Sequence, residues 1–153
     1  MSLPMADAIH PDFATRIAAS FARQGIMGTI GATLSKVAKG EIEITLLVAP
    51  HISQQHGFVH AGVVAAIADS ACGYAALSLM PPGAGVLTTE FKINLMAPAG
   101  GEHLVARGRI IKAGRTLTVA QAEVYAVKAG HEKLCALLTA SLMTIEGRDS
   151  IAD

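Results

Sequence analysis

One carboxylate, Asp69, stands alone in an apolar stretch of the chain. Between Glu43 and Glu90 it is the only formally charged side chain, and Val, Ala, Ile, Cys, Tyr and Leu residues surround it in the sequence. A carboxylate in such a stretch needs a cavity, a partner, hydrogen bonds or a proton, because burying it without compensation is very costly. It either stabilises local structure or acts as an acid, a base or a nucleophile.

The position of Asp69 favours chemistry over a local structural role. The predicted helical residues continue for about ten positions beyond it, so Asp69 lies in the middle of a helix and cannot be an N-cap. No Lys or Arg stands at the helical spacing that would pair with it. We therefore interpret Asp69 as a catalytic carboxylate.

The beginning of the same predicted helix could supply a second group. Residues Val59 to Gly62 offer no Ser, Thr, Asp or Asn cap, so free backbone N–H groups point into the preceding loop, where they can hold an oxyanion. Ala61 and Asp69 are about 12 Å apart along the helix, which is too far for one helix to serve one carbonyl. We expect two helices packed antiparallel across a dimer, with two sites per dimer.

Polar side chains gather around this loop. His51, His56 and His60 cluster there, and His56 and His60 have the spacing of zinc ligands, but no Glu follows and both precede or begin the helix. We expect no metal, and we expect His60 to order the loop through a backbone or cross-subunit hydrogen bond. Gln54 and Thr88 either orient a water molecule or the carbonyl, or are an ordinary loop amide and strand hydroxyl.

Four basic residues flank predicted turns: Lys112, Arg115, Lys128 and Lys133. They either meet phosphate groups at the mouth of the site or are solvated strand ends.

The composition limits the class of protein. A chain of 153 residues forms one domain with a sizeable core. Hydrophobic residues make up 52%, charged residues 16%, and the mean hydropathy is +0.46, so we expect a second subunit to cover part of the apolar surface. The net charge is zero and no basic run occurs, which argues against nucleic-acid binding.

The localisation expected from the sequence is cytoplasmic. Two cysteines without a disulfide or metal spacing fit a reducing compartment, and the N-terminus has no secretory pattern. Residues 61–80 carry one Asp and have no flanking Lys or Arg, so we reject a membrane span.

Hydrophobic periodicity predicts an α+β fold. Residues 10–25 form a short amphipathic helix with Gly25 as its stop, and two strands from Ala32 onward form a hairpin at Lys39 and Gly40. A break at residues 81–85 follows the long helix, and then come four strand-like segments, 86–100, 102–114, 115–127 and 132–147. An antiparallel sheet of about six strands should wrap around the central helix, whose many small residues allow close approach.

Three stretches carry a resemblance to a known family: HGFVHAGVVAAIADSACG, GVLTTEFKINLMAPAGG and the turn at Gly114 and Arg115. Over roughly residues 30–145 they resemble the hotdog-fold acyl-CoA thioesterases of the phenylacetic-acid-degradation (PaaI) type. The resemblance implies a lead-in helix at 1–28, a hotdog domain at 29–147 and a tail at 148–153. It also implies homodimers paired into homotetramers, with no metal or redox cofactor, because CoA is part of the substrate.

The resemblance also implies roles for single residues. Asp69 matches the catalytic carboxylate, and Ala61 matches the backbone N–H that polarises the thioester carbonyl. Gln54 matches an amide near the thioester, and Thr88 matches a hydroxyl that helps to place water or the carboxylate from the partner chain. His60 matches the His of the family's His-Gly-Gly motif.

The motif departs from the family at one position, because this chain has His60-Ala61-Gly62. The N–H donor survives the change from Gly to Ala, although the methyl group crowds the acyl side. Gly62, Lys112 and Arg115 are expected to contact the CoA part of the substrate. The expected activity is hydrolysis of an acyl-CoA thioester; the alternatives are a hotdog-fold hydratase or dehydratase that uses His56 or His60, and a non-catalytic acyl-CoA binding module.

Overall fold

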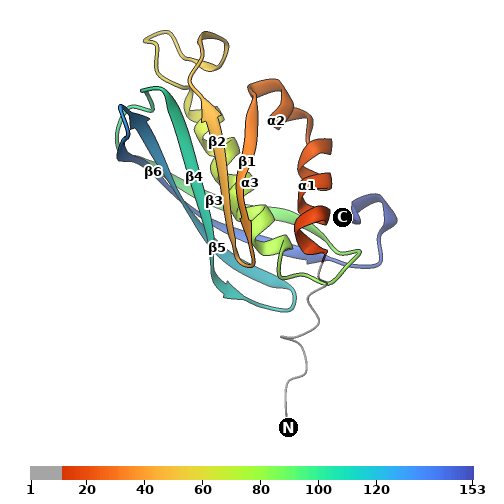
Figure 1. Cartoon of the computed structure of the whole chain (residues 1–153). Coiled ribbons are helices and arrows are strands. Elements are labelled where there is room, and N and C mark those ends of the chain that lie inside the picture. Colours follow the sequence, from red (N-terminus) through yellow and green to blue (C-terminus); the bar gives the residue numbers. More distant parts are fainter. Residues whose placement is uncertain (1–11) are drawn as a thin grey trace.

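The structure is a computed structural model that describes residues 12–153. The first residues of the predicted helix 10–25 and of the expected unit 1–28 lie outside the described part. One antiparallel sheet, in the order β1-β2-β4-β5-β6-β3, curls around the long helix α3 (Figure 1). The elements are α1 (Phe13–Arg23), α2 (Gly25–Ile30), β1 (Ala32–Ala38), β2 (Glu41–Leu47), η1 (Pro50–Ile52), α3 (Ala61–Leu77), β3 (Gly85–Leu95), β4 (His103–Ala113), β5 (Leu117–Lys128), β6 (His131–Ile145) and η2 (Asp149–Ile151).

The predicted strands and the hotdog fold are confirmed. The hairpin of β1 and β2 turns at Lys39 and Gly40, and the alternation in β2 buries Ile42, Ile44 and Leu46 on the face toward α3. The helix contacts β2, β3, β4, β5 and β6, so the sheet wraps around it. Because strands approach α3 from several sides, its buried positions are mostly small, as at Ala68, Ala71, Cys72, Ala75 and Ala76.

Gly108 in β4 marks the closest approach between the sheet and α3. A Cβ atom at this position would lie 2.5 Å from the backbone carbon and oxygen of Ala71. Backbone atoms cannot turn aside, so we expect Gly108→Ala to lower the free energy of unfolding by about 1–3 kcal/mol. Urea denaturation measures this loss.

A matched control for this prediction is Gly73→Ala, on α3 itself. The nearest atom to its added Cβ is Leu142 Cδ2 at 3.9 Å, an ordinary contact, and Ala is a better helix former than Gly. This variant should keep or raise the stability. Equal denaturation midpoints for the two variants would contradict the close approach at Gly108.

The N-terminal helix ends earlier than the sequence predicts, and Gly25 is not its stop. α1 ends at Arg23, the backbone of Gln24 is extended, and Gly25 is the first residue of α2, which sequence reasoning missed. Hydrogen bonds between Gln24 and the α3 residues Ser70 and Tyr74 hold the break, and α2 buries Met27 and Ile30. The glycine that ends a helix here is Gly31, at the end of α2, and its φ of 78° is in the left-handed region that favours glycine.

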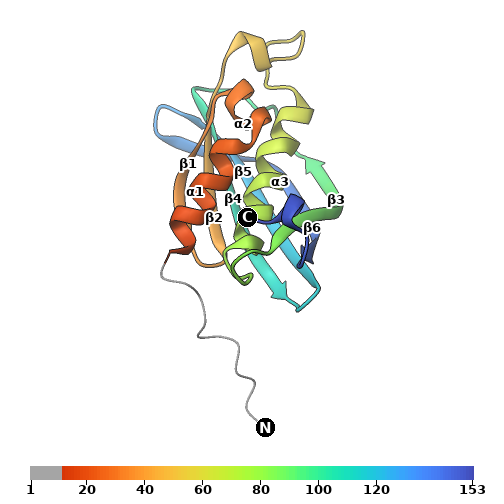
Figure 2. The same cartoon turned by 90° about the vertical axis from the view of Figure 1, so that its right-hand side faces the viewer.

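Arg16 joins α1 to the end of α3. Its guanidinium donates to the carbonyl oxygens of Leu77 at 2.7 Å, Met80 at 3.1 Å and Pro81 at 3.0 Å. These carbonyls lie at the negative end of the helix dipole, where a cation is stabilising. α1 therefore lies beside α3, and the C-terminal residues reach the same side of the molecule (Figure 2).

Within residues 12–153, no helix combines the length and apolar character needed to cross a membrane.

Candidate active site

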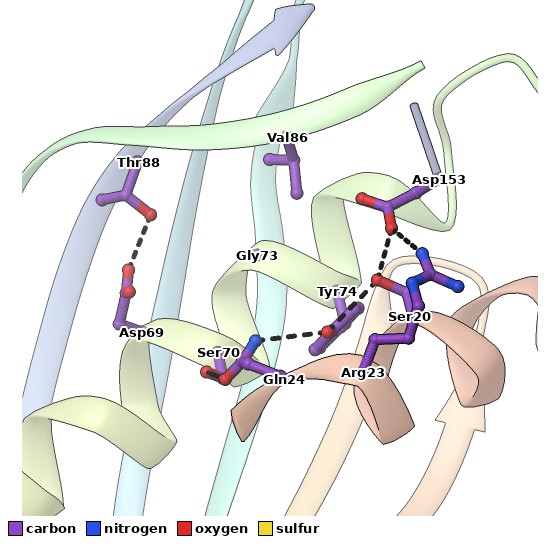
Figure 3. Close-up of a pocket in the computed structure, with 10 residues that line it drawn as sticks. All are labelled: Ser20, Arg23, Gln24, Asp69, Ser70, Gly73, Tyr74, Val86, Thr88 and Asp153. Atoms are coloured by element: carbon purple, nitrogen blue, oxygen red, sulfur yellow. Dashed lines mark hydrogen bonds and ion pairs between the residues drawn. The ribbon is translucent and has the colours of Figure 1, made fainter. Parts of the chain in front are cut away.

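Asp69 lies on α3 and faces the edge strand β3. Thr88 of β3 donates its hydroxyl hydrogen to Asp69 Oδ1 at 2.8 Å (Figure 3). The residue is half-buried, and it forms no ion pair with the described part of the chain. Burial raises the pKa of Asp69 above the ordinary value of an Asp, and the hydrogen bond from Thr88 opposes this rise. Such a carboxyl group accepts a proton more readily than an ordinary Asp does.

The structure shows which carboxylate Thr88 contacts within one chain. The family resemblance implies that Thr88 helps to place water or the carboxylate from the partner chain, and here its hydroxyl contacts Asp69 of its own chain. The two residues are close because β3 pairs with β6 at the edge of the sheet and passes over the middle of α3.

Asp69 opens into a cavity of about 300 Å³, which we call the Asp69 groove. Ser70, Gly73 and Tyr74 of α3 form one wall with Asp69, and Val86 and Thr88 of β3 form another. The last wall combines α1 with the end of the chain, through Ser20, Arg23, Gln24 and Asp153. Sequence reasoning missed this last wall, because no motif marks these residues.

Hydrogen bonds tie the last wall to α3. Ser70 donates to Gln24 Oε1 at 2.9 Å, and Gln24 Nε2 donates to the Tyr74 hydroxyl at 3.2 Å. Asp153 accepts from Ser20 at 2.6 Å and from Arg23 at 2.7 Å. One side of the groove is therefore formed by polar groups that already hold one another in place.

The beginning of α3 is capped, contrary to the prediction of an uncapped helix. His60 Nδ1 accepts a hydrogen bond from the Gly62 N–H at 2.8 Å, because an imidazole nitrogen can replace the oxygen of a Ser or Asp cap. The His60 N–H donates to the Ile52 carbonyl oxygen at 2.9 Å. This is a backbone hydrogen bond of the kind expected to order the loop. A Cβ at Gly62 would lie 3.1 Å from this nitrogen, so Gly62 makes room for the cap.

The Ala61 N–H remains without a hydrogen bond in the described part of the chain. It borders a separate cavity of about 410 Å³, the helix-tip hollow, together with Gln54, Phe58, His60 and Leu95. The Gln54 amide oxygen accepts from the backbone N–H of His56 and shapes the loop. Gln54, His60 and Ala61 are thus together, while Asp69 and Thr88 line a different cavity.

Lys112 and Arg115 lie far from the helix-tip hollow within one chain. Just before them, the Ile110 N–H bonds the Gly40 carbonyl at 3.1 Å, and the Gly40 N–H bonds Ser78 Oγ at 2.7 Å. Ser78 follows the last turn of α3, so this part of β4 lies at the opposite end of the helix from Ala61.

Neither a metal nor a reactive cysteine is indicated by the described residues. Residues 12–153 contain no group of three His, Cys, Asp or Glu side chains placed to hold a metal ion. Burial, with a smaller effect of Asp69, raises the pKa of Cys72 to about 12, so this thiol stays protonated and unreactive.

Comparison with known proteins adds a family. Residues 56–131 match the model of the thioesterase superfamily. A thioesterase family protein from Silicibacter pomeroyi is 47% identical in sequence; the match covers 88% of this chain and 99% of that one, with a TM-score of 0.87. The match with the superfamily model includes Ala61, Asp69 and Thr88. It begins at residue 56 and so does not include Gln54.

More distant structures share the fold. A thioesterase from Haemophilus influenzae is 24% identical, with 83% of this chain and 87% of that chain covered and a TM-score of 0.76. The PaaI protein from the phenylacetic acid degradation operon of E. coli is 20% identical, with 92% and 98% covered and a TM-score of 0.80. At these identities the likeness extends to the arrangement of helix and sheet.

Proposed function

The chain belongs to the thioesterase superfamily, and on that premise we propose that it hydrolyses acyl-CoA thioesters to a free acid and CoA, as a PaaI-type enzyme. The observation that carries the proposal is the state of Asp69. Its carboxylate is half-buried, has Thr88 as its one hydrogen-bond donor in the described chain, and faces an open groove. A carboxylate with free acceptor positions can take a proton from water or attack a carbonyl carbon.

Hydrolysis needs two groups around one carbonyl. In the proposed reaction Asp69 takes a proton from water, and the water oxygen forms a bond with the thioester carbon; alternatively, Asp69 attacks that carbon itself and water then releases the acid. The Ala61 N–H donates to the carbonyl oxygen as negative charge develops there. The carbon–sulfur bond then breaks, and the CoA thiolate leaves and takes up a proton.

The two groups come from two copies of the chain in this proposal. Within one chain, Asp69 and Ala61 are eight residues apart on α3 and border different cavities. A second copy with its α3 antiparallel to the first would place the helix tip of one chain beside Asp69 of the other. The enzyme is then a homodimer with two sites, and pairing of dimers gives the homotetramer.

The edge strand β3 supports such a dimer. Phe91 and Leu95 pair in register with the buried Ala140 and Ala136 of β6, which place them on the α3 side of the sheet. They are nevertheless 45% and 53% exposed. An edge strand with exposed apolar side chains favours a partner chain along its free edge.

The same arrangement gives Lys112 and Arg115 a role. They lie at the C-terminal end of α3, so in an antiparallel pair they approach Ala61 and Gly62 of the other copy. Two cations at that position can bind the CoA phosphates. In this proposal Gln54, which borders the helix-tip hollow, contacts the thioester.

Hydrolysis is better supported than hydration or dehydration. A hydratase needs a His that is free to transfer a proton beside the acyl chain. In the proposed dimer the helix tip of one chain brings His60 beside Asp69 of the other, but the Nδ1 atom of His60 is engaged in capping α3.

Thiol release from a panel of acyl-CoAs tests the proposal. We expect the purified protein to release thiol from one class among short, medium, long and aryl acyl-CoAs, and Asp69→Asn to lose that release. Binding without release over hours would indicate a binding module, and consumption of an enoyl or hydroxyacyl thioester without free thiol would indicate a hydratase or dehydratase.

Removing the Thr88 hydroxyl should change the pH dependence. The hydrogen bond from Thr88 holds down the pKa of Asp69, so Thr88→Val raises this pKa further. If ionised Asp69 is the active form, activity is lost as pH falls through its pKa. The acidic limb of the kcat/KM profile should therefore move to higher pH.

The control for this shift is Thr89→Val, because the Thr89 hydroxyl donates to the Ser141 carbonyl rather than to Asp69. Its acidic limb should coincide with that of the wild type. If the acidic limbs of the kcat/KM profiles coincide for the wild type and both variants, Asp69 is not the group whose ionisation controls activity.

A further inference from the structure

Most residues that line the Asp69 groove, which receives the acyl group in the proposed reaction, carry a polar side-chain group. Of the residues that line it, only Gly73 and Val86 lack a polar side-chain group. An unsubstituted alkyl chain that enters this groove takes water away from the polar groups and returns no hydrogen bond to them, which is unfavourable. The lining therefore fits an acyl group that carries a polar substituent.

The direction of each hydrogen bond follows from the number of hydrogens available. Ser20 has one hydroxyl hydrogen and donates it to the Asp153 carboxylate. In the 3.3 Å contact between Ser20 and Tyr74, the Tyr74 hydroxyl must then be the donor. Tyr74 also accepts from Gln24, and Gln24 accepts from Ser70. The chain of bonds thus runs in one direction, from Ser70 to Asp153.

Two residues in this series of hydrogen bonds can each form one more hydrogen bond. The Gln24 amide has two N–H hydrogens and uses one of them on Tyr74 within the described chain, and the Tyr74 oxygen accepts one hydrogen bond and has room for a second. Both residues line the groove, with the Gln24 side chain between Ser70 and Tyr74 (Figure 3). One donor beside one acceptor matches a hydroxyl group, which both donates and accepts.

We propose that Gln24 and Tyr74 form a subsite for a hydroxyl group on the acyl chain, so that the preferred substrates are short hydroxyacyl-CoA thioesters. This inference rests on the proposed thioesterase function. Gly73 is one helical turn, about 6 Å, beyond Asp69 and offers no side chain to obstruct the path. A short chain with its thioester carbon at Asp69 therefore reaches Gln24 and Tyr74.

A charged acyl group fits this groove less well. A substrate carboxylate would face the carboxylates of Asp69 and Asp153, while the single guanidinium, that of Arg23, already binds Asp153 at 2.7 Å. Like charges at this spacing repel. A neutral hydroxyl group on the substrate is not repelled by these carboxylates.

Matched acyl-CoAs of equal carbon number test the subsite. We expect kcat/KM for 3-hydroxybutyryl-CoA or 4-hydroxybutyryl-CoA to exceed that for butyryl-CoA by about tenfold, the value of one good hydrogen bond. In Gln24→Met and in Tyr74→Phe this ratio should fall to near one. The two variants remove different halves of the subsite, so either one suffices if the other fails to fold.

Ser20→Ala distinguishes recognition from a structural role. It removes hydrogen bonds to Tyr74 and Asp153 from the same network but leaves Gln24 and the Tyr74 hydroxyl facing the groove. The hydroxyl preference should persist in this variant, whereas a network that merely holds α1 in place would lose it in all three.

The outcomes separate the two proposals. Thiol release from butyryl-CoA that equals release from both hydroxylated analogues overturns the subsite and leaves the thioesterase function standing. A protein that releases thiol from no acyl-CoA overturns the thioesterase function, and the subsite with it.

Discussion

Replacing Asp69 with Asn is expected to lower the rate of thiol release by about 10²–10⁴-fold, the usual contribution of a positioned general base. The amide cannot take a proton from water and cannot attack a carbonyl carbon. Its oxygen still accepts the hydrogen bond from Thr88, and its volume matches that of the carboxylate, so the groove keeps its shape. The measurement is kcat/KM for the best acyl-CoA, with thiol detected directly.

The same variant should be more stable than the wild type at neutral pH. Burial raises the pKa of Asp69 in the folded state above its unfolded value, so the folded state binds this proton more tightly. The stability contributed by Asp69 is therefore greatest below the unfolded pKa and is lost as pH rises through the folded pKa. Asn removes this loss, so its melting temperature should exceed that of the wild type by a few degrees at pH 7.

This stability difference should shrink in acid, where the Asp69 carboxyl is protonated in both states. Asp149→Asn is the matched control, because Asp149 is exposed in η2 and should change neither activity nor stability. Full thiol release by Asp69→Asn would show that the mechanism is wrong.

Replacing Ala61 with Pro is expected to lower kcat by about 10²–10³-fold, because it deletes one oxyanion donor. Ala61 is the first residue of α3, where Pro is well tolerated and only the N–H is lost. The preceding His60 has φ −59° and ψ 139°, the conformation that a following Pro requires. Ala61→Gly keeps the N–H and should remain active, which makes it the matched control.

A mixture of the two inactive variants tests whether the site spans two chains. In a dimer of Ala61→Pro with Asp69→Asn, one site combines both changes and the other combines an intact Ala61 with an intact Asp69. Random exchange makes half of the dimers mixed, and each has one intact site, so about a quarter of the wild-type specific activity should return.

Sites contained within one chain would give a different result. Each variant would then carry its own defect in every site, and mixing would restore nothing. Refolding the two variants together from denaturant and then measuring thiol release decides between the arrangements.

The elements of the fold could be predicted because their signals are local. Alternating side chains define strands such as Glu41–Leu47, and the run of small apolar residues in Ala61–Leu77 defines a helix that strands approach on several sides. Asp69 could be singled out for the same reason, since one charge in an apolar stretch is visible without any structure. The break after Arg23 could not, because contacts to α3 produce it.

Only the tertiary structure decided which residues surround Asp69. Thr88 reaches it because β3 lies at the edge of the sheet, next to β6, and Gln24 reaches Tyr74 because Arg16 and the α1 packing bring the end of α1 beside α3. The placement of Arg115 at the far end of α3 likewise depends on strand order. Periodicity records how each segment buries its own side chains, whereas contacts between residues distant in the sequence arise only when strand order and helix packing are set.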